Sequence, residues 1–408
     1  MSANKLAGKQ GKEATHSGGK GEILHDWFPY LEGFSPNFVS NLLTKFLPDA
    51  KLILEPFAGV GTTPLSLVQQ GISTAYCELN PVLRELISAK QEVLLGNNTT
   101  LVKDLDKLST ALSKLMDKAA EDKNLRKTYA DCFLSSVYFP EENFIKILKL
   151  KSIERKLDKS VQKYFSIAVF SSLLEASFLK RAGDVRFKTK KDIEKGIPSI
   201  EDLVSKKLAL ISKDIQAIDK TYKSKIILLA GDSKELNTIK PIQADGVITS
   251  PPYLNGTNYF RNTKLELWYS EFMKTQADLK NLRHHAITAG INDVEKDSGK
   301  TILAEVKKVY LEISEVCYDK RIPKMIAAYF TDMKQVFQGI QKNVKQGGII
   351  CVDIGDSVYS NVHIPTHKIL IKVGLSIGWT LVDEIVLRER FSNNGAKLSQ
   401  RLLVFKNE

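Results

Sequence analysis

Short apolar runs and longer stretches of helical periodicity alternate in the first quarter of the chain. The segment 51–56 contains a buried apolar run typical of a strand, Thr62 to Gln70 has the spacing of a helix that Gly71 closes, and Ser73 to Cys77 forms a second apolar run. A helix is also predicted from Pro36 to about Phe46, with Ser35 as its cap. The strand–helix–strand order predicts a parallel sheet.

The same pattern returns in the C-terminal half. The predicted elements are strands at 226–230, 246–248, 349–354, near 380–387 and at 401–405, and helices at 323–342 and from Pro365. Both parts together predict an α/β fold with a doubly wound, Rossmann-like sheet. We expect this domain to comprise residues 23–99 and 225–408.

The region between these parts, about 100–224, has a different pattern. Apolar residues recur there at helical spacing, as in Phe144, Ile147 and Leu148, and few segments resemble strands. Residues 151–225 contain 18 lysines and arginines against 10 aspartates and glutamates. The sequence therefore predicts a basic helical insertion in the α/β domain.

Composition narrows the function classes. The 408 residues include 59 Lys+Arg and 47 Asp+Glu, and the net charge of +12 favours a polyanionic partner such as nucleic acid. The cysteines are scattered, which argues against a disulfide scaffold or a zinc module. Residues 1–22 are polar and lack the apolar core of a secretory signal, so we expect a flexible tail and a cytoplasmic protein.

A glycine loop lies between the first predicted strand and its helix. Gly59 and Gly61 allow a tight turn and a close approach of a ligand to the backbone. The third glycine of a dinucleotide fingerprint is missing, which argues against NAD. Glu78 ends the second strand, where an acid can bind both hydroxyls of a ribose. S-adenosylmethionine, a nucleoside without a pyrophosphate, fits this pattern.

The segment Thr249-Ser250-Pro251-Pro252-Tyr253 follows another predicted strand directly. Two prolines fix its backbone, so that the Ser250 hydroxyl and the Pro251 carbonyl can accept hydrogen bonds from one exocyclic amine. Tyr253 offers a flat face for an unstacked base. The predicted catalytic residues are Ser250, Pro251, Pro252 and Tyr253.

With these motifs the sequence resembles the DNA amino-methyltransferases, in particular the cytosine-N4 branch of bacterial restriction–modification methylases. The resemblance rests on Phe57 to Gly61 and on Ser250 to Tyr253, and it covers about 1–95 and 225–408. It implies direct methyl transfer from S-adenosylmethionine to N4 of a flipped cytosine in double-stranded DNA, without a metal. It also implies a cognate restriction endonuclease in the same system.

The resemblance assigns further residues to the cofactor. Phe28-Pro29-Tyr30 and Phe34-Ser35-Pro36 resemble the element at the methionine end, and Gly231-Asp232 resembles the acid beside the adenine ring. The predicted cofactor residues are Tyr30, Ser35, Glu55, Phe57, Gly59, Gly61, Thr62, Glu78 and Asp232.

Two regions are candidates for contact with DNA. Arg181, Arg186 and Lys188 belong to a basic loop around a glycine turn in the insertion. Asn258, Arg261 and Lys264 belong to the segment 254–322, which follows the catalytic motif. The sequence leaves open which region reads the target.

Several alternatives remain beside the cytosine-N4 assignment. Adenine-N6 methylation is the second choice, methylation of an RNA base the third, and a catalytically silent DNA-binding protein the choice from another class. Cytosine-C5 chemistry is rejected, because none of the cysteines (Cys77, Cys132, Cys317 and Cys351) follows a proline. His284 and His285 lack a third metal ligand at suitable spacing, so we expect no metal site there.

Overall fold

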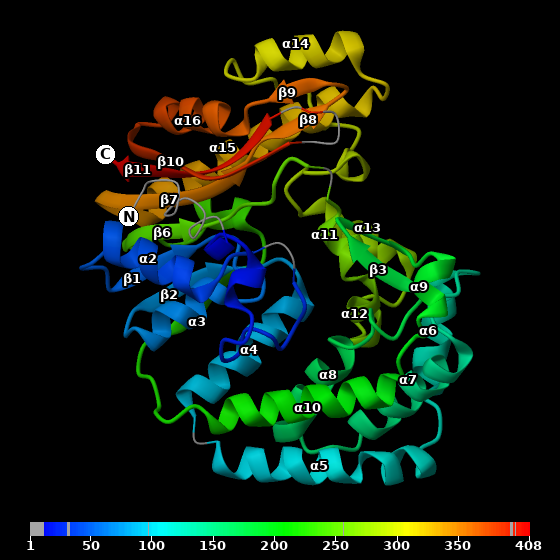
Figure 1. Cartoon of the computed structure of the whole chain (residues 1–408). Helices are drawn as coiled ribbons and strands as arrows, with labels where there is room; N and C mark the ends of the chain where they lie inside the picture. Colours follow the sequence, from blue (N-terminus) through cyan, green and yellow to red (C-terminus); the bar gives the residue numbers. More distant parts are fainter. Residues whose placement is uncertain (1–11, 31–32, 97, 256, 392–394, 396) are drawn as a thin grey trace.

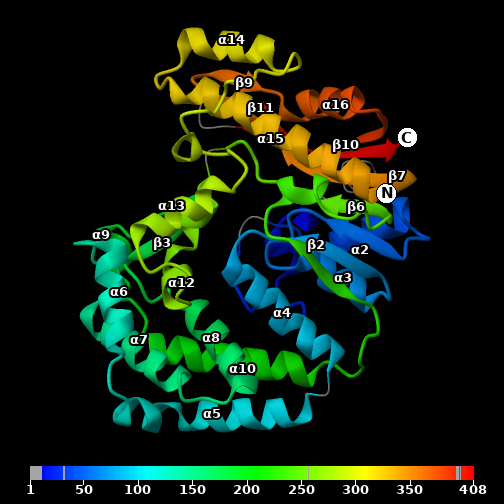
Figure 2. The ribbon, with the colours of Figure 1, turned by 180° about the vertical axis from the view of Figure 1, so that it is seen from behind.

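The computed structural model describes residues 12–408 except 31–32, 97, 256, 392–394 and 396. It contains an α/β domain and a helical lobe, which arches from α5 below the sheet to α13 and α11 (Figures 1 and 2). None of the described helices combines the length and hydropathy that crossing a lipid bilayer requires.

In the described residues, seven strands form one sheet in the order β10-β11-β7-β6-β1-β2-β5. The strands are β1 (Leu52–Glu55), β2 (Ser73–Cys77), β5 (Ile226–Ala230), β6 (Ala244–Thr249), β7 (Val344–Gly355), β10 (Trp379–Phe391) and β11 (Lys397–Asn407). Neighbouring strands are parallel except that β11 runs antiparallel to both β7 and β10. The doubly wound Rossmann-like sheet is thus confirmed, and its order reverses between β1 and β6.

Helices cover both faces of the sheet, since successive side chains of its central strands point to opposite faces and nearly all of these residues are buried. Ile53 of β1 belongs to the apolar cluster around α2, whereas Leu54 belongs to the cluster around α15 and α16. The flanking helices are α2 (Pro36–Phe46), α3 (Thr62–Gln69), α4 (Pro81–Leu95), α15 (Arg321–Asn343) and α16 (Thr366–Ser376). Ser35 caps α2, as predicted, by accepting a hydrogen bond from the Phe38 amide at 3.2 Å.

The insertion is helical as predicted, with one exception. Its helices are α5 (Thr99–Lys118), α6 (Lys123–Phe133), α7 (Glu141–Glu154), α8 (Lys159–Phe170), α9 (Lys190–Glu194) and α10 (Ile200–Gln216). The predicted basic loop is instead a β-hairpin of β3 (Leu179–Ala182) and β4 (Asp184–Phe187). Gly183 forms its turn with φ +77°, a conformation that glycine adopts readily.

The segment after β6 leaves the sheet: residues 259–284 join the helical lobe, whereas Val306 and Ile313 belong to an apolar cluster of the α/β domain. It contains α11 (Tyr259–Asn262), α12 (Lys264–Tyr269), α13 (Gln276–His284), η3 (Ile291–Asp293) and α14 (Lys307–Val316). Trp268 and Tyr269 of α12 are fully buried in the same apolar cluster as α6, α7 and α8. Asn80, which caps α4, donates to the Thr263 hydroxyl at 2.8 Å and connects this segment to the α/β domain.

The remaining elements lie outside the central sheet. The η2 turn (Ser233–Asn237) follows β5, and β8 (Ser357–Tyr359) pairs with β9 (Val362–Ile364) in a short hairpin after β7.

The prediction of a flexible N-terminal tail is wrong for residues 12–22, and residues 1–11 lie outside the described part. Residues 16–19 form the short helix η1 (His16–Gly19), and Ala14 is buried. The Ser35 amide donates to the Glu13 carbonyl at 2.8 Å, and the Gln400 side chain donates to the Ala14 carbonyl at 3.2 Å. These bonds attach the segment to α2 and β11, a long-range effect that its polar composition does not reveal.

Candidate active site

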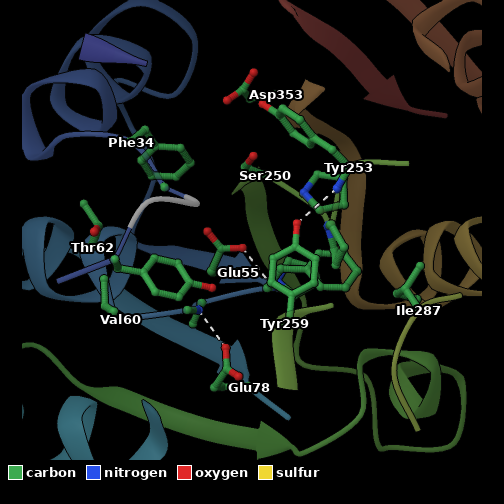
Figure 3. A pocket seen from close by; sticks show the side chains of 18 of the residues that line it. Phe34, Glu55, Val60, Thr62, Glu78, Ser250, Tyr253, Tyr259, Ile287 and Asp353 are labelled. Atoms are coloured by element: carbon green, nitrogen blue, oxygen red, sulfur yellow. Dashed lines mark hydrogen bonds between the residues drawn. The ribbon is translucent and has the colours of Figure 1, made fainter. Parts of the chain in front are cut away.

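A cavity of about 320 Å³ lies at the carboxyl ends of the parallel strands, where open α/β sheets bind ligands (Figure 3). Its walls come from the loops after β1, β2, β5 and β6 and from the end of β7. The cavity therefore brings together the glycine loop, Glu78, Asp232 and the predicted catalytic motif, although up to about 200 residues separate them in sequence.

The glycine loop has the backbone geometry that requires glycine. Gly59 has φ +55° and Gly61 has φ +87°. A Cβ atom on Gly61 would lie 2.8 Å from Cγ1 of Ile87, and one on Gly59 would lie 3.3 Å from the Tyr30 ring. Tyr30 thus lies against the loop, as expected for a residue of the N-terminal element, and a larger side chain at Gly61 would displace the loop.

Glu78 holds the glycine loop from the neighbouring strand. One carboxylate oxygen accepts a hydrogen bond from the Gly59 amide at 2.7 Å (Figure 3). The other accepts from the Asn80 amide at 2.7 Å. Burial raises the pKa of this carboxyl to about 7. An ionised carboxylate has about four acceptor positions, so Glu78 can bind two further hydroxyl groups in the cavity.

Glu55 connects three elements of the site below the cavity. It accepts hydrogen bonds from the Phe57 amide at 2.9 Å, from the Thr63 hydroxyl at 2.7 Å and from the Thr249 hydroxyl. Burial raises the pKa of this carboxyl to about 7 as well. Because Thr249 directly precedes Ser250, Glu55 fixes the glycine loop and the catalytic motif relative to each other.

The predicted cofactor residues divide into two groups. Those that line the cavity are Tyr30, Glu55, Phe57, Gly59, Thr62, Glu78 and Asp232. Ser35 and Gly61 are not among the lining residues, because they occupy the N-caps of α2 and α3. Both residues have a structural role in these caps, and their predicted contact with the cofactor stays a prediction.

The Ser-Pro-Pro-Tyr motif forms the other end of the cavity. The Tyr253 amide donates to the Tyr259 hydroxyl at 3.3 Å, and the Tyr329 hydroxyl donates to the Pro252 carbonyl at 2.9 Å. Tyr253 packs over Gly355, where a Cβ atom would lie 3.0 Å from the Tyr253 ring. The prolines and these two bonds hold the loop in one conformation.

Asp353 is a site residue that the sequence analysis missed. It is buried near the end of β7, and the Gln400 side chain lies 2.9 Å from each of its carboxylate oxygens. Burial raises the pKa of Asp353 to about 7, although hydrogen bonds from Gln400, Tyr253 and Ser250 oppose that shift. A buried acid within an apolar strand was the signal in the sequence, since such a group needs partners.

Two of the predicted DNA-binding cations in the hairpin have structural partners. Arg181 donates to the Pro29 carbonyl at 3.0 Å, and Lys188 donates to the carbonyls of Glu175 at 2.9 Å and Ser177 at 2.6 Å. These bonds attach the hairpin to the fold. The side chain of Arg186 is exposed, so it remains the best candidate of the three for contact with DNA.

The three predicted DNA-binding residues after the catalytic motif differ in exposure and in their partners. Asn258 is buried and caps α11 by accepting from the Arg261 amide at 2.9 Å, so its side chain has a structural role. Arg261 is exposed, and the Lys264 ammonium lies 3.8 Å from the centroid of the Tyr138 ring.

No cysteine is present among the described residues that line the cavity. Burial raises the pKa of Cys77 and of Cys351 to about 12, so neither thiol is a thiolate near neutral pH. His284 lies 3.1 Å from a Glu295 oxygen, whereas His285 lines the cavity. In the described part of the chain, no group of three or more His, Cys, Asp or Glu residues has the geometry of a metal site.

Comparison with known proteins gives a distant but long match. A scan against models of protein families finds none that matches. The chain is 24% identical to Type II methyltransferase M.BsoBI of Geobacillus stearothermophilus, over 95% of this chain and 85% of that protein. It is 23% identical to Type II methyltransferase M.AvaI of Nostoc sp. and of Anabaena variabilis, over 93% of this chain and 84% of each relative.

Among solved structures, TrmN from Thermus thermophilus aligns at a TM-score of 0.30 with 10% identity, over 92% of this chain and 49% of that chain. The rRNA methyltransferase aviRa from Streptomyces viridochromogenes aligns at 0.31 with 6% identity, over 94% of this chain and 90% of that chain. The order of the strands in the central sheet alone supports the α/β fold of this chain.

Proposed function

We propose that this chain is a site-specific DNA methyltransferase that transfers a methyl group from S-adenosylmethionine to N4 of a flipped cytosine in double-stranded DNA. In this proposal it is the modification enzyme of a restriction–modification system in the cytoplasm, and a cognate endonuclease shares its target. The similarity to Type II methyltransferases over nearly the whole chain supports this assignment.

One observation carries the proposal. The glycine loop with Glu78 and the Ser-Pro-Pro-Tyr motif with Asp353 line the same cavity. A methyl donor bound at the first end and an amine bound at the second end would face each other within one enclosed space. Such positioning of two reactants supplies much of the rate of a transfer reaction.

The residues at the first end fit S-adenosylmethionine. Glu78 has acceptor positions for the ribose hydroxyls, Asp232 lies beside it at the end of β5, and Tyr30 flanks the glycine loop. When bound there, the cofactor supplies an electrophilic methyl group on a sulfonium ion. Burial raises the pKa values of Glu55 and Glu78 to about 7, and a cation bound beside them would favour their charged forms, which would then act as its counter-charge.

The residues at the second end fit an exocyclic amine. The Ser250 hydroxyl accepts a hydrogen bond from the amine, and Tyr253 stacks on the base. As the new N–C bond forms, the amine nitrogen becomes cationic and must lose a proton. Asp353 is hydrogen-bonded to Ser250 and has a pKa near 7, so it can take up this proton. No covalent bond between the protein and the base is required.

The identity of residue 250 favours cytosine over adenine. Asp or Asn is more frequent at this position in the adenine-N6 branch, whereas this chain has Ser250. Adenine-N6 methylation remains the second candidate, because the same acceptors can bind either amine. Methylation of an RNA base is the third candidate. DNA binding without catalysis is the candidate from another class of protein. The cavity with its hydrogen-bonded acids argues against a DNA-binding protein without catalytic activity.

Base-resolved methylation analysis of genomic DNA from cells that express the protein tests the proposal. We expect N4-methylcytosine at one fixed position of a recurring short sequence. The Ser250→Ala variant should leave this DNA unmethylated, and the matched control Ser376→Ala, at the exposed end of α16, should methylate it fully. DNA with no new modification in cells that contain folded parent protein would refute the proposed function.

A further inference from the structure

A second hollow of about 590 Å³ lies in the helical lobe, and we name it the basic groove. Its described lining residues are Cys132, Phe133, Ser136, Tyr138, Asn258, Arg261, Lys264, Met273, Gln276, Ala277, Leu279, Lys280, Arg283 and Asn292. Four of these are cations (Arg261, Lys264, Lys280 and Arg283), and among these described lining residues none is an aspartate or glutamate. The lining of the basic groove is therefore positively charged, although Asp293 lies within electrostatic range of Arg283 and Asp278 lies within range of Cys132.

Both the helical insertion and the segment 254–322 build the basic groove. Residues 132–138 of the insertion form one wall, and residues 258–292 form the rest. The walls are joined by the Cys132 thiol, which donates to the Met273 carbonyl at 3.4 Å, and by Lys264, which lies over the Tyr138 ring. Phe187 of the hairpin stacks on the outer side of Tyr138 at 5.7 Å. The insertion and the segment after the catalytic motif thus form one surface.

The basic groove adjoins the cavity of the active site along two elements. On α11, Tyr259 and Phe260 line the cavity, whereas Arg261 lines the groove. At the end of α13, Arg283 lines the groove, and His285 lines the cavity. The two hollows therefore adjoin, so a nucleotide chain that leaves the cavity on this side would enter the groove.

We propose that the basic groove binds the phosphates of the DNA strand that flanks the flipped base. This inference rests on the proposed function of the cavity. Cations along a groove attract phosphates and displace their counterions, which gives binding that does not depend on base sequence. The side chains of Gln276 and Asn292 add amide donors for phosphate or base oxygens along the same groove.

A matched pair of triple variants tests the inference. The groove variant is Arg261→Gln, Lys280→Gln and Arg283→Gln. The control variant is Lys103→Gln, Lys114→Gln and Lys118→Gln, which removes the same charge from exposed positions of α5. The full-length proteins are titrated with a fluorescent mixed-sequence DNA duplex at salt concentrations from about 50 to 200 mM.

We expect the groove variant to lower the slope of log K against log salt by about 2.7, because each lost phosphate contact removes about 0.9. The control variant should keep the parental slope. Calorimetry with S-adenosylmethionine should give the parental affinity for both variants, which shows that the groove variant retains its fold.

The outcomes separate the inference from the function on which it rests. If the parent methylates DNA but the groove variant keeps the parental salt slope, the basic groove does not bind phosphate. The same conclusion follows if the salt slope of the control variant falls as much as that of the groove variant. If the parent transfers no methyl group to DNA, the proposed function fails and the inference falls with it.

Discussion

The cavity and the basic groove lie side by side but use charge in opposite ways. In the cavity, Glu55 and Asp353 are buried, Glu78 is partly buried, and all three are hydrogen-bonded; burial raises the pKa of each to about 7. In the basic groove, four cations line an open surface without an acid among its described residues. The first arrangement positions reacting groups, and the second attracts a long polyanion.

The difference predicts how the two regions respond to substitution. A buried carboxylate that holds two loops acts through geometry, so its loss changes rates or cofactor affinity and depends little on salt. An exposed cation acts through long-range attraction, so its loss changes DNA affinity most at low salt. Substitutions in each region therefore test whether the distinction holds.

Ser250→Ala should have the largest effect on the cavity side. Removing one acceptor that strengthens in the transition state lowers the turnover number on the order of 10²–10³-fold. The affinity of the variant for S-adenosylmethionine, measured by calorimetry, should match that of the parent, because the Ser250 hydroxyl is proposed to contact the amine of the target base and not the cofactor. A variant that loses cofactor affinity but keeps its rate at saturating cofactor would show that Ser250 belongs to the cofactor end.

Glu78→Gln should act on the cofactor instead. Hydrogen bonds to a charged group contribute about 1.5–3 kcal/mol each, which corresponds to a rise in the Michaelis constant for S-adenosylmethionine of roughly 10- to 100-fold. The turnover number should stay near the parental value. An unchanged Michaelis constant would leave Glu78 with only its bonds to Gly59 and Asn80.

The pH dependence of turnover should report Asp353. Because burial raises the pKa of its carboxyl to about 7, Asp353 is protonated below that pH and cannot accept the proton of the amine. The turnover number at saturating cofactor should therefore rise with pH through about 7. The Asp353→Asn variant should have a lower turnover number, and that number should not rise with pH through about 7. An identical pH profile in the variant and the parent would show that Asp353 does not accept the proton.

Arg186→Gln should have the smallest effect. Its exposed side chain can neutralise one phosphate, so the salt slope of DNA binding should fall by about 0.9 while turnover at saturating DNA is retained. Arg181→Gln serves as the comparison, because Arg181 already bonds the Pro29 carbonyl. The expected effect there is a lower melting temperature of the protein. Equal salt slopes in the parent and Arg186→Gln would place the hairpin outside the DNA surface.

The sequence predicted the central sheet and both ends of the cavity because their signals are local. Gly61 needs φ +87°, and two adjacent prolines restrict the backbone after β6, so both motifs are visible in a few residues. Asp353 could not be assigned in this way, because its role depends on Gln400, 47 residues further along the chain.

The hairpin and the N-terminal segment show the same limit. The strands of the β3–β4 hairpin are only four residues long and alternate weakly, and the Val185 amide is fixed by the side chain of Asn262 at 2.9 Å. Residues 12–22 are polar, and their order comes from bonds to β11 and α2. In both cases tertiary contacts outweigh local composition.

Mass spectrometry of nucleosides tests the central claim most directly. Unmethylated genomic DNA is incubated with purified protein and S-adenosylmethionine, then digested to nucleosides, with Ser250→Ala and Ser376→Ala treated in parallel. The account predicts N4-methylcytosine with the parent and with Ser376→Ala, and an initial rate of its formation on the order of 10²–10³-fold lower with Ser250→Ala. N6-methyladenine would contradict the cytosine assignment, and 5-methylcytosine or no methylated nucleoside would contradict the proposed chemistry of the cavity.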